Sequence, residues 1–302
     1  MAKGPNTPDR PEGTHVELEV EPTVAGRIAR WTAQARILRK RVESARDHHT
    51  SIDLGFTVVE RDSSIGGALL AGALAYRLFV LLLPSALLFV SGLGVYSDLV
   101  DESAGTVAQE AGLRGLVASE VAVTASSSAR WVVFIVMLPA VVYAIVKLYR
   151  AIAIVHAIVW HGSGRGVQIT RKGVLLFIGV LLFNFAAVEI VSWIRRHDEL
   201  GGLSALLVYL VLLGGAWLVV SMELPHRDVS WRTLVPGALL FGVGAQLINV
   251  FNVYITTRLV EGRADTYGAL GIAAALLFSL VLVGRLIVVS AELNASLDDR
   301  RA

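Results

Sequence analysis

Long apolar runs recur along the chain and constrain its fold more than any other feature. Each has about 20 residues or more, and a helix of that length crosses the roughly 30 Å hydrocarbon core of a membrane. Hydrophobic residues make up 55% of the 302 residues and charged residues only 17%. We therefore predict an all-α polytopic membrane protein whose transmembrane domain, residues 62–297, contains six transmembrane helices. The predicted spans lie near residues 66–96, 131–150, 173–193, 203–222, 234–254 and 268–291.

The first of these runs is longer than one span requires. As a single straight helix it would extend roughly 48 Å, which exceeds the hydrocarbon core. We expect an interfacial piece before Arg77, followed by the span itself. The positions at which the run could break or tilt are Gly66, Gly67, Gly72, Arg77 and Pro84.

The distribution of Lys and Arg predicts the orientation in the membrane. An even number of spans places both termini on one side. The segments that would then share this side carry 19 of the 27 basic residues. We therefore predict that both termini are cytoplasmic (N-in/C-in), with residues 298–302 as a short cytoplasmic tail. The segments with the basic excess are 1–65, 147–172, 223–233 and 298–302.

The segment ahead of the first span has two parts. Residues 1–23 are rich in Pro, Gly and Glu, which predicts a disordered cytoplasmic tail. Residues 24–47 place apolar side chains at steps of three and four, while Arg and Lys cover much of the remaining surface. We predict a basic amphipathic helix that lies on the membrane and binds anionic inner-leaflet headgroups. A short coiled coil is the alternative, because the same spacing also forms a heptad seam.

The longest predicted outer loop, residues 97–130, is acidic and has apolar residues at helical spacing. One interpretation is a set of short helices on the outer surface. The other is a solvated acidic loop.

Three charged residues lie inside or at the edge of apolar runs, where a charge is costly unless it is paired or hydrated. They are Arg77, Arg285 and Glu292, and the predicted orientation places all three in the inner leaflet. Arg285 and Glu292 share a helix face, but two turns put about 10 Å between their backbones. A partner on another helix is therefore expected. We consider Arg77 as the partner of Glu292, which would leave Arg285 facing a cavity or phosphate headgroups.

The fifth run carries three amides spaced three residues apart, Gln246, Asn249 and Asn252, which we call the amide stripe. Its side chains either hydrogen-bond between helices or line a substrate path. Small residues in the first run recur at four-residue spacing and predict close packing against a neighbouring helix. These are Gly67, Ala71 and Ala75.

Short motifs stand in a fixed order along the chain. The first span contains LAY followed by a proline, the fifth begins with PGA and leads to a Tyr, and YGALG and AELNA mark the two ends of the sixth. In order and spacing, most of residues 60–297 resembles the YihY/BrkB family of bacterial inner-membrane proteins. The motif residues include Leu74, Ala75, Tyr76, Pro84, Pro236, Gly237, Ala238, Tyr254, Tyr267, Gly268 and Asn294.

This resemblance implies a multi-pass protein of the bacterial inner (plasma) membrane with a role in transport, linked to lipid or lipopolysaccharide handling. The family has also been labelled a ribonuclease. Metal-dependent RNA processing of that kind would require clustered His and Asp, such as an HxHxDH run. The seven histidines have no such spacing, and the chain has no P-loop. We therefore expect a protein that is not an enzyme, with no metal, no cofactor and no nucleic-acid partner.

Two functions fit these observations. In the first, the protein translocates a lipid or another amphipathic anionic envelope component. The three intramembrane charges would receive the headgroup, and the amide stripe would extend the path outward. In the second, it is a structural or scaffolding protein of the envelope, and the same polar groups only hold helices together. A membrane-embedded hydrolase would need a nucleophile, base and metal set that the sequence lacks. Membrane lipids are the expected partners, and the protein could form homo-oligomers.

Overall fold

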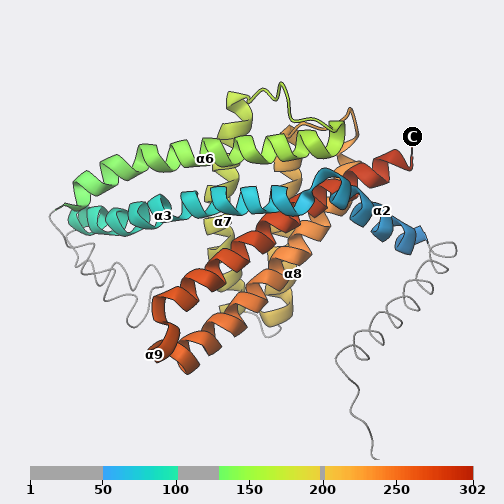
Figure 1. Cartoon of the computed structure of the whole chain (residues 1–302). Coiled ribbons are helices and arrows are strands. Elements are labelled where there is room, and N and C mark those ends of the chain that lie inside the picture. The colour runs from blue at the N-terminus through green and yellow to red at the C-terminus, as the bar shows by residue number, and fades with distance from the viewer. Residues whose placement is uncertain (1–49, 101–128, 198–200, 302) are drawn as a thin grey trace, which may run out of the picture. The chain divides into compact units, whose positions relative to one another are not determined.

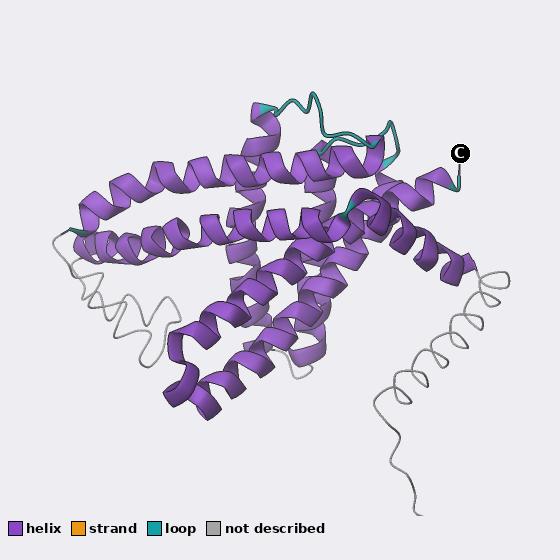
Figure 2. Ribbon diagram, viewed as in Figure 1, coloured by secondary structure: helices purple, strands orange, loops and turns teal. Residues whose placement is uncertain are grey.

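The computed structural model describes residues 50–100, 129–197 and 201–301 (Figure 1). In these ranges the chain is helical apart from short turns and connections, and it contains no strand (Figure 2). The all-α class is confirmed for this part of the chain. The predicted tail at 1–23, the amphipathic helix at 24–47 and most of the outer loop at 97–130 lie outside the described residues. Leu54–Ala302 forms one compact unit.

Within the described ranges, short connections at Gly66, at residues 162–170 and at residues 224–230 join successive helices. The last of them, α9, doubles back on itself, so that a first arm, Trp231–Asn252, lies beside a second arm, Ala274–Asp299 (Figure 1). The other helices also pack in pairs, α3 against α6 and α7 against α8. The elements are α2 (Thr50–Ile65), α3 (Gly67–Val100), α6 (Arg130–His161), α7 (Arg171–His197), α8 (Gly201–Glu223) and α9 (Trp231–Asp299).

Several helix boundaries have local backbone causes. Gly66, with a φ of 69°, separates α2 from α3 in a left-handed conformation that glycine adopts at little cost. Gly162, with a φ of 71°, follows α6 and donates its N–H to the carbonyl of Ile158. Thr170 precedes α7, and its hydroxyl accepts the N–H of Gly173 at 3.1 Å, which caps the helix start.

Five of the six predicted spans coincide with segments long and apolar enough to cross a membrane. They lie in α3, in α6, in α8 (Ser204–Glu223) and in the two arms of α9. The remaining predicted span, 173–193, is helical as part of α7 but is not among these five, so the total of six stays a prediction. Large apolar side chains are exposed on the helices, as expected when hydrocarbon rather than water surrounds them. Examples are Leu83, Val132 and Val211.

The expected break before Arg77 occurs at Gly66, one of the positions named for it, and no second break separates an interfacial piece from the span. Helix α3 is continuous from Gly67 to Val100 and includes both Arg77 and Pro84. The chain turns earlier, at Gly66, because this residue takes the left-handed conformation. Proline inside a membrane helix is tolerated where neighbouring groups satisfy the freed backbone.

The main buried cluster lies where α3 and α7 begin and where α6 and α8 end. The predicted close packing of small residues is confirmed, because Gly67, Ala71 and Ala75 are all buried. A Cβ atom at Gly284 would lie 2.5 Å from the carbonyl oxygen of Ala71, so the backbones of α3 and the second arm of α9 are in direct contact. Large residues of the cluster are Leu74, Leu148, Ile152, Trp160, Val220, Leu234 and Val288.

A buried amide joins the two arms of α9 at Pro236. Proline has no N–H and disturbs the hydrogen bonds of the helix around it. The N–H of Gly237 donates to Oδ1 of Asn294 at 2.7 Å, and Nδ2 of Asn294 donates to the carbonyl of Leu234 at 3.2 Å. A Cβ atom at Gly237 would overlap the carbonyl oxygen of Ser290. The PGA and AELNA motifs therefore form one contact, in which glycine provides space and asparagine provides hydrogen bonds.

Candidate functional site

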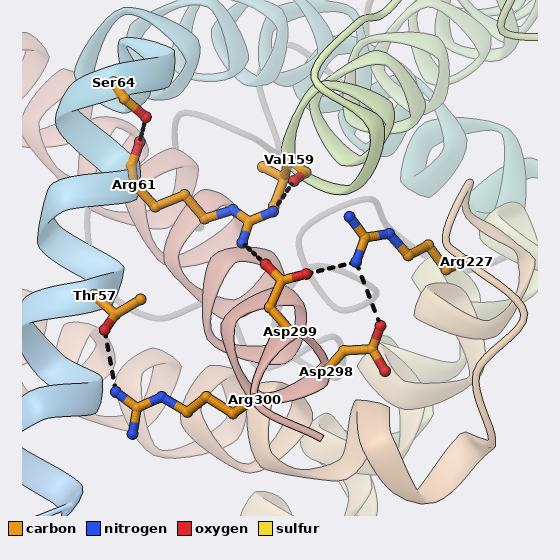
Figure 3. Close-up of polar contacts among 8 residues, drawn as sticks. All are labelled: Thr57, Arg61, Ser64, Val159, Arg227, Asp298, Asp299 and Arg300. Atoms are coloured by element: carbon orange, nitrogen blue, oxygen red, sulfur yellow. Dashed lines mark hydrogen bonds and ion pairs between the residues drawn. The ribbon is translucent and has the colours of Figure 1, made fainter. Parts of the chain in front are cut away.

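Charged side chains gather where several helix ends meet (Figure 3). Arg61 of α2 donates to Oδ2 of Asp299 at 2.6 Å and to the carbonyl of Val159, near the end of α6, at 2.7 Å. Arg227, from the connection between α8 and α9, donates to Oδ1 of Asp299 at 2.5 Å and lies 3.7 Å from Asp298. These bonds tie the last turn of α9 to α2, to α6 and to that connection.

The next residue of α2, Asp62, forms a second ion pair with α9. Nη1 and Nη2 of Arg285 donate to its two carboxylate oxygens at 2.5 Å and 2.6 Å. This bidentate arrangement is among the stronger ion-pair geometries. The side chain of Asp62 is 14% exposed and that of Arg285 is 38% exposed. Gly67 makes room for the pair, because a Cβ atom there would overlap Asp62.

Glu292 lies on the same arm of α9 and is fully buried. Neither carboxylate oxygen accepts a hydrogen bond from any residue that the structure describes. The hydroxyl of Ser296, one turn further along, is buried in the same way and also lacks a described partner. Asp62, Arg285 and Arg61 are the charged groups that act on Glu292. We call the following set the arginine–carboxylate cluster: Arg61, Asp62, Arg227, Arg285, Glu292, Asp298 and Asp299.

The connection between α8 and α9 forms the edge of the cluster. The hydrogen bond to Asp299 raises the pKa of Arg227, which keeps this guanidinium charged. Burial lowers the pKa of the neighbouring His226, whose ring packs edge-on against Trp160 with 6.2 Å between the centroids. A cleft of about 410 Å³ opens at this edge and is lined in part by Arg61 and Arg227. The cleft therefore reaches the guanidinium that acts on Glu292.

An apolar cavity of about 340 Å³ lies between the helices. Every predicted span contributes to its wall, with Leu81 from α3, Ile152 from α6, Phe177 from α7, Ala216 from α8, and Phe241 and Val283 from the two arms of α9. Polar groups in the wall come from Asn184, Tyr209 and Trp217. The indole N–H of Trp217 already donates to the Ser290 hydroxyl at 3.2 Å. The cavity thus suits an apolar group such as an acyl chain.

The arginine–carboxylate cluster and the apolar cavity both lie in a part of the chain that matches a known protein family. A family model described as Virulence factor BrkB matches residues 58–302. The chain belongs to the BrkB family. No curated protein and no solved structure matches it. The family predicted from the motifs is therefore confirmed, and in this BrkB protein the matched range includes the whole arginine–carboxylate cluster and the whole cavity wall.

The three intramembrane charges predicted in this BrkB protein do not form one site. Arg77 is exposed, and its guanidinium carbon lies 5.9 Å from the ring centroid of its neighbour Tyr76. The expected pairing of Arg77 with Glu292 is not formed. Arg285 instead pairs with Asp62 of α2, a partner on another helix as expected, while 38% of its side chain stays exposed.

The three residues of the amide stripe have different surroundings. Gln246 is half-buried and Asn249 is exposed. Asn252 accepts a hydrogen bond from the hydroxyl of Ser279, on the opposite arm of α9, at 2.5 Å. No residue of the stripe belongs to the wall of the apolar cavity. For Asn252 the contact favours the interpretation as a hydrogen bond between helices.

The motif residues also fall into groups. Pro236, Gly237 and Asn294 meet in the joint between the arms of α9. Tyr76 is exposed and Pro84 is half-buried within α3. The remaining motif positions belong to the part of α9 whose side chains lie outside the described residues, and they are Tyr254, Tyr267 and Gly268.

Sequence reasoning missed five members of the site, which are Arg61, Asp62, Arg227, Asp298 and Asp299. Asp62 and Arg285 are 223 residues apart, so no local pattern relates them. One signal was available, because Asp62 stands four residues before the first predicted span and an arginine within a span calls for a carboxylate.

Proposed function

We propose that this BrkB protein is a translocator that moves an amphipathic anionic lipid of the envelope across the bacterial inner membrane. The apolar cavity is the observation that carries the proposal. Its volume of about 340 Å³ falls within the range of about 300 to 1,000 Å³ of ligand sites. Because every spanning helix supplies part of its wall, a movement of one helix against another changes access to it. The acyl part of the substrate would occupy this space.

The headgroup of such a lipid needs a cation near the cavity. Arg77 supports this role because it is exposed and stands beside Leu78 and Leu81, which line the cavity from the same helix. Its guanidinium could give a phosphate charge-assisted hydrogen bonds. Arg285 could contribute only after its pair with Asp62 opens.

We place both termini in the cytosol and count α7 as the sixth span. The basic excess supports this orientation, and the described parts of its segments around Arg61, Val159 and Arg227 meet at the arginine–carboxylate cluster. A reporter that is active only in the cytosol is expected to be active when fused after residue 302 or inserted at residue 164. The same reporter inserted at residue 199 is expected to be inactive. Activity at 199 with none at the other two positions would invert the assigned leaflets.

Filling the cavity should slow transport. Phenylalanine at Ala216 would project into the space that the acyl chain requires, and we expect lipid movement about tenfold slower. The measurement is movement of fluorescent phospholipid between leaflets of vesicles that contain the purified protein. Ala86→Phe is the matched control, because Ala86 is exposed on α3 and does not line the cavity.

The outcomes of this assay separate the candidate functions. Folded wild-type protein that moves no phospholipid faster than empty vesicles would overturn the translocator proposal. That result would favour the structural envelope role. Equal rates for Ala216→Phe, Ala86→Phe and wild type would exclude the cavity from the path.

A further inference from the structure

All three arginines of the cluster already have counterions. Arg285 is held by both oxygens of Asp62, Arg61 by Asp299 together with a backbone carbonyl, and Arg227 by Asp299 and Asp298. Among the described residues of the cluster, Glu292 is therefore the carboxyl group that has no cation of its own. It is also the member of the cluster that is fully buried.

An ionised Glu292 would be unfavourable in this position. A buried carboxylate without hydrogen bonds loses its hydration and gains nothing in return. Asp62 is one of the charged groups that act on Glu292, and two neighbouring carboxyl groups do not both ionise easily. A proton on Glu292 resolves both problems, because a protonated carboxyl donates to Asp62 and carries no charge.

We propose that Glu292 is a proton-binding site whose protonated carboxyl donates a hydrogen bond to the Asp62 carboxylate. Binding forms one O–H bond on a Glu292 oxygen, and the proton comes from water in the cleft beside Arg61. The described groups that act on Glu292 are Asp62 and Arg61 from α2 and Arg285 from its own arm, and none of them belongs to α3 or α6.

The ion pair next to Glu292 supplies a route for releasing the proton. Arg285 and Glu292 are seven residues apart and share one face of the helix. When Arg285 leaves Asp62, its guanidinium can turn to Glu292 and favour the ionised form, and the proton returns to water. Glu292 is thus protonated while Arg285 pairs with Asp62, and ionised when Arg285 turns to Glu292.

A proton fits this site better than a metal cation does. Hard cations take about six or more oxygen ligands. Both oxygens of Asp62 are engaged by Arg285, which leaves the Glu292 carboxyl and the Ser296 hydroxyl as the orphan oxygens of this face in the described part of the chain. A proton needs only one donor atom and one acceptor.

The second part of the inference rests on the proposed function. If the protein moves lipid, the proton site couples that movement to a proton gradient. Transport by wild-type protein is then expected to change with a pH difference across the vesicle membrane, whereas transport by Glu292→Gln is expected not to respond.

The proton site itself is tested without transport. A hydrophobic carbodiimide reacts with protonated carboxyl groups in apolar surroundings, and mass spectrometry of peptides locates the adduct. We expect an adduct at Glu292 that increases as the pH falls. Glu223 is the internal control, because its carboxylate pairs with Lys172 and should remain unlabelled.

Two substitutions should shift the labelling in opposite directions. Asp62→Asn removes a neighbouring negative charge and frees Arg285, so Glu292 should ionise and the adduct should fall about tenfold at neutral pH. Arg285→Gln removes the cation, so labelling should persist to higher pH. Size-exclusion elution like that of wild type shows that each variant is folded.

Absence of an adduct at Glu292 in folded wild type at every pH would overturn the proton site. Protection of Glu292 by sodium ions at constant pH would also overturn it, in favour of a metal cation. A clear adduct together with lipid transport that ignores the pH gradient would overturn the coupling. A wild type that labels normally but moves no lipid would refute the proposed function and leave the proton site standing.

Discussion

Gly237→Ala is expected to destabilise the folded protein by about 3 kcal/mol or more, or to prevent folding. The added methyl group would overlap the carbonyl oxygen of Ser290 and the amide of Asn294. Relief requires the two arms of α9 to separate, and the hydrogen bond between Gly237 and Asn294 would lengthen with them. The measurement is the thermal midpoint of the purified protein in detergent, together with the yield of monodisperse protein.

The control for this experiment is Gly72→Ala. Gly72 is an exposed helical glycine, and a Cβ atom added to it would meet open space, with no neighbouring atom within 4 Å. Alanine there should be neutral or should stabilise by up to about 1 kcal/mol, because it favours a helix more than glycine does. Equal midpoints for both variants would show that the arms of α9 are not in close contact at Gly237.

Asn294→Leu is expected to destabilise the protein by about 3 kcal/mol. Leucine is similar in size but cannot bond to the N–H of Gly237 or the carbonyl of Leu234, and both groups lie in a buried part of the joint. An unpartnered backbone group is costly there because no water replaces the amide. Thermal unfolding of the two proteins in the same detergent measures the difference.

Asn249→Leu provides the comparison, because it makes the same chemical change at an exposed position of the first arm. Its midpoint should equal that of wild type within error. If Asn294→Leu were equally harmless, the amide would not satisfy the backbone around Pro236 and the joint would rest on packing alone.

The hydrophobic pattern predicted most of the fold because the bilayer imposes the same requirement on every span. An apolar run of sufficient length must satisfy its own backbone, and helices do so wherever they occur. The buried face of α3 was also predictable, since Gly67, Ala71 and Ala75 repeat at a spacing that brings them onto one side. The choice of Gly66 for the connection between α2 and α3 was not predictable, because a glycine-rich sequence allows several breaks and only one is used.

The candidate site was predicted less completely. The sequence identifies Arg285 and Glu292 as candidates because they are charges in an apolar run. Their contacts, however, depend on how α2 packs against the second arm of α9. Asp62 binds Arg285 across 223 residues of sequence, and side-chain periodicity within one helix says nothing about such a contact. The motifs marked Gly237 and Asn294 without assigning their role, which required the contact between the two arms that brings these residues together across 57 positions of sequence.

The order in which the chain is made bears on the ion pairs of α2. Arg61 meets Asp299 across 238 residues, and every spanning helix lies between them in the sequence. Neither this pair nor the one between Asp62 and Arg285 can form until the second arm of α9 has been synthesised and inserted. Until then Arg61 and Asp62 are without these partners, so closure of the two pairs is a late step that completes the assembled domain.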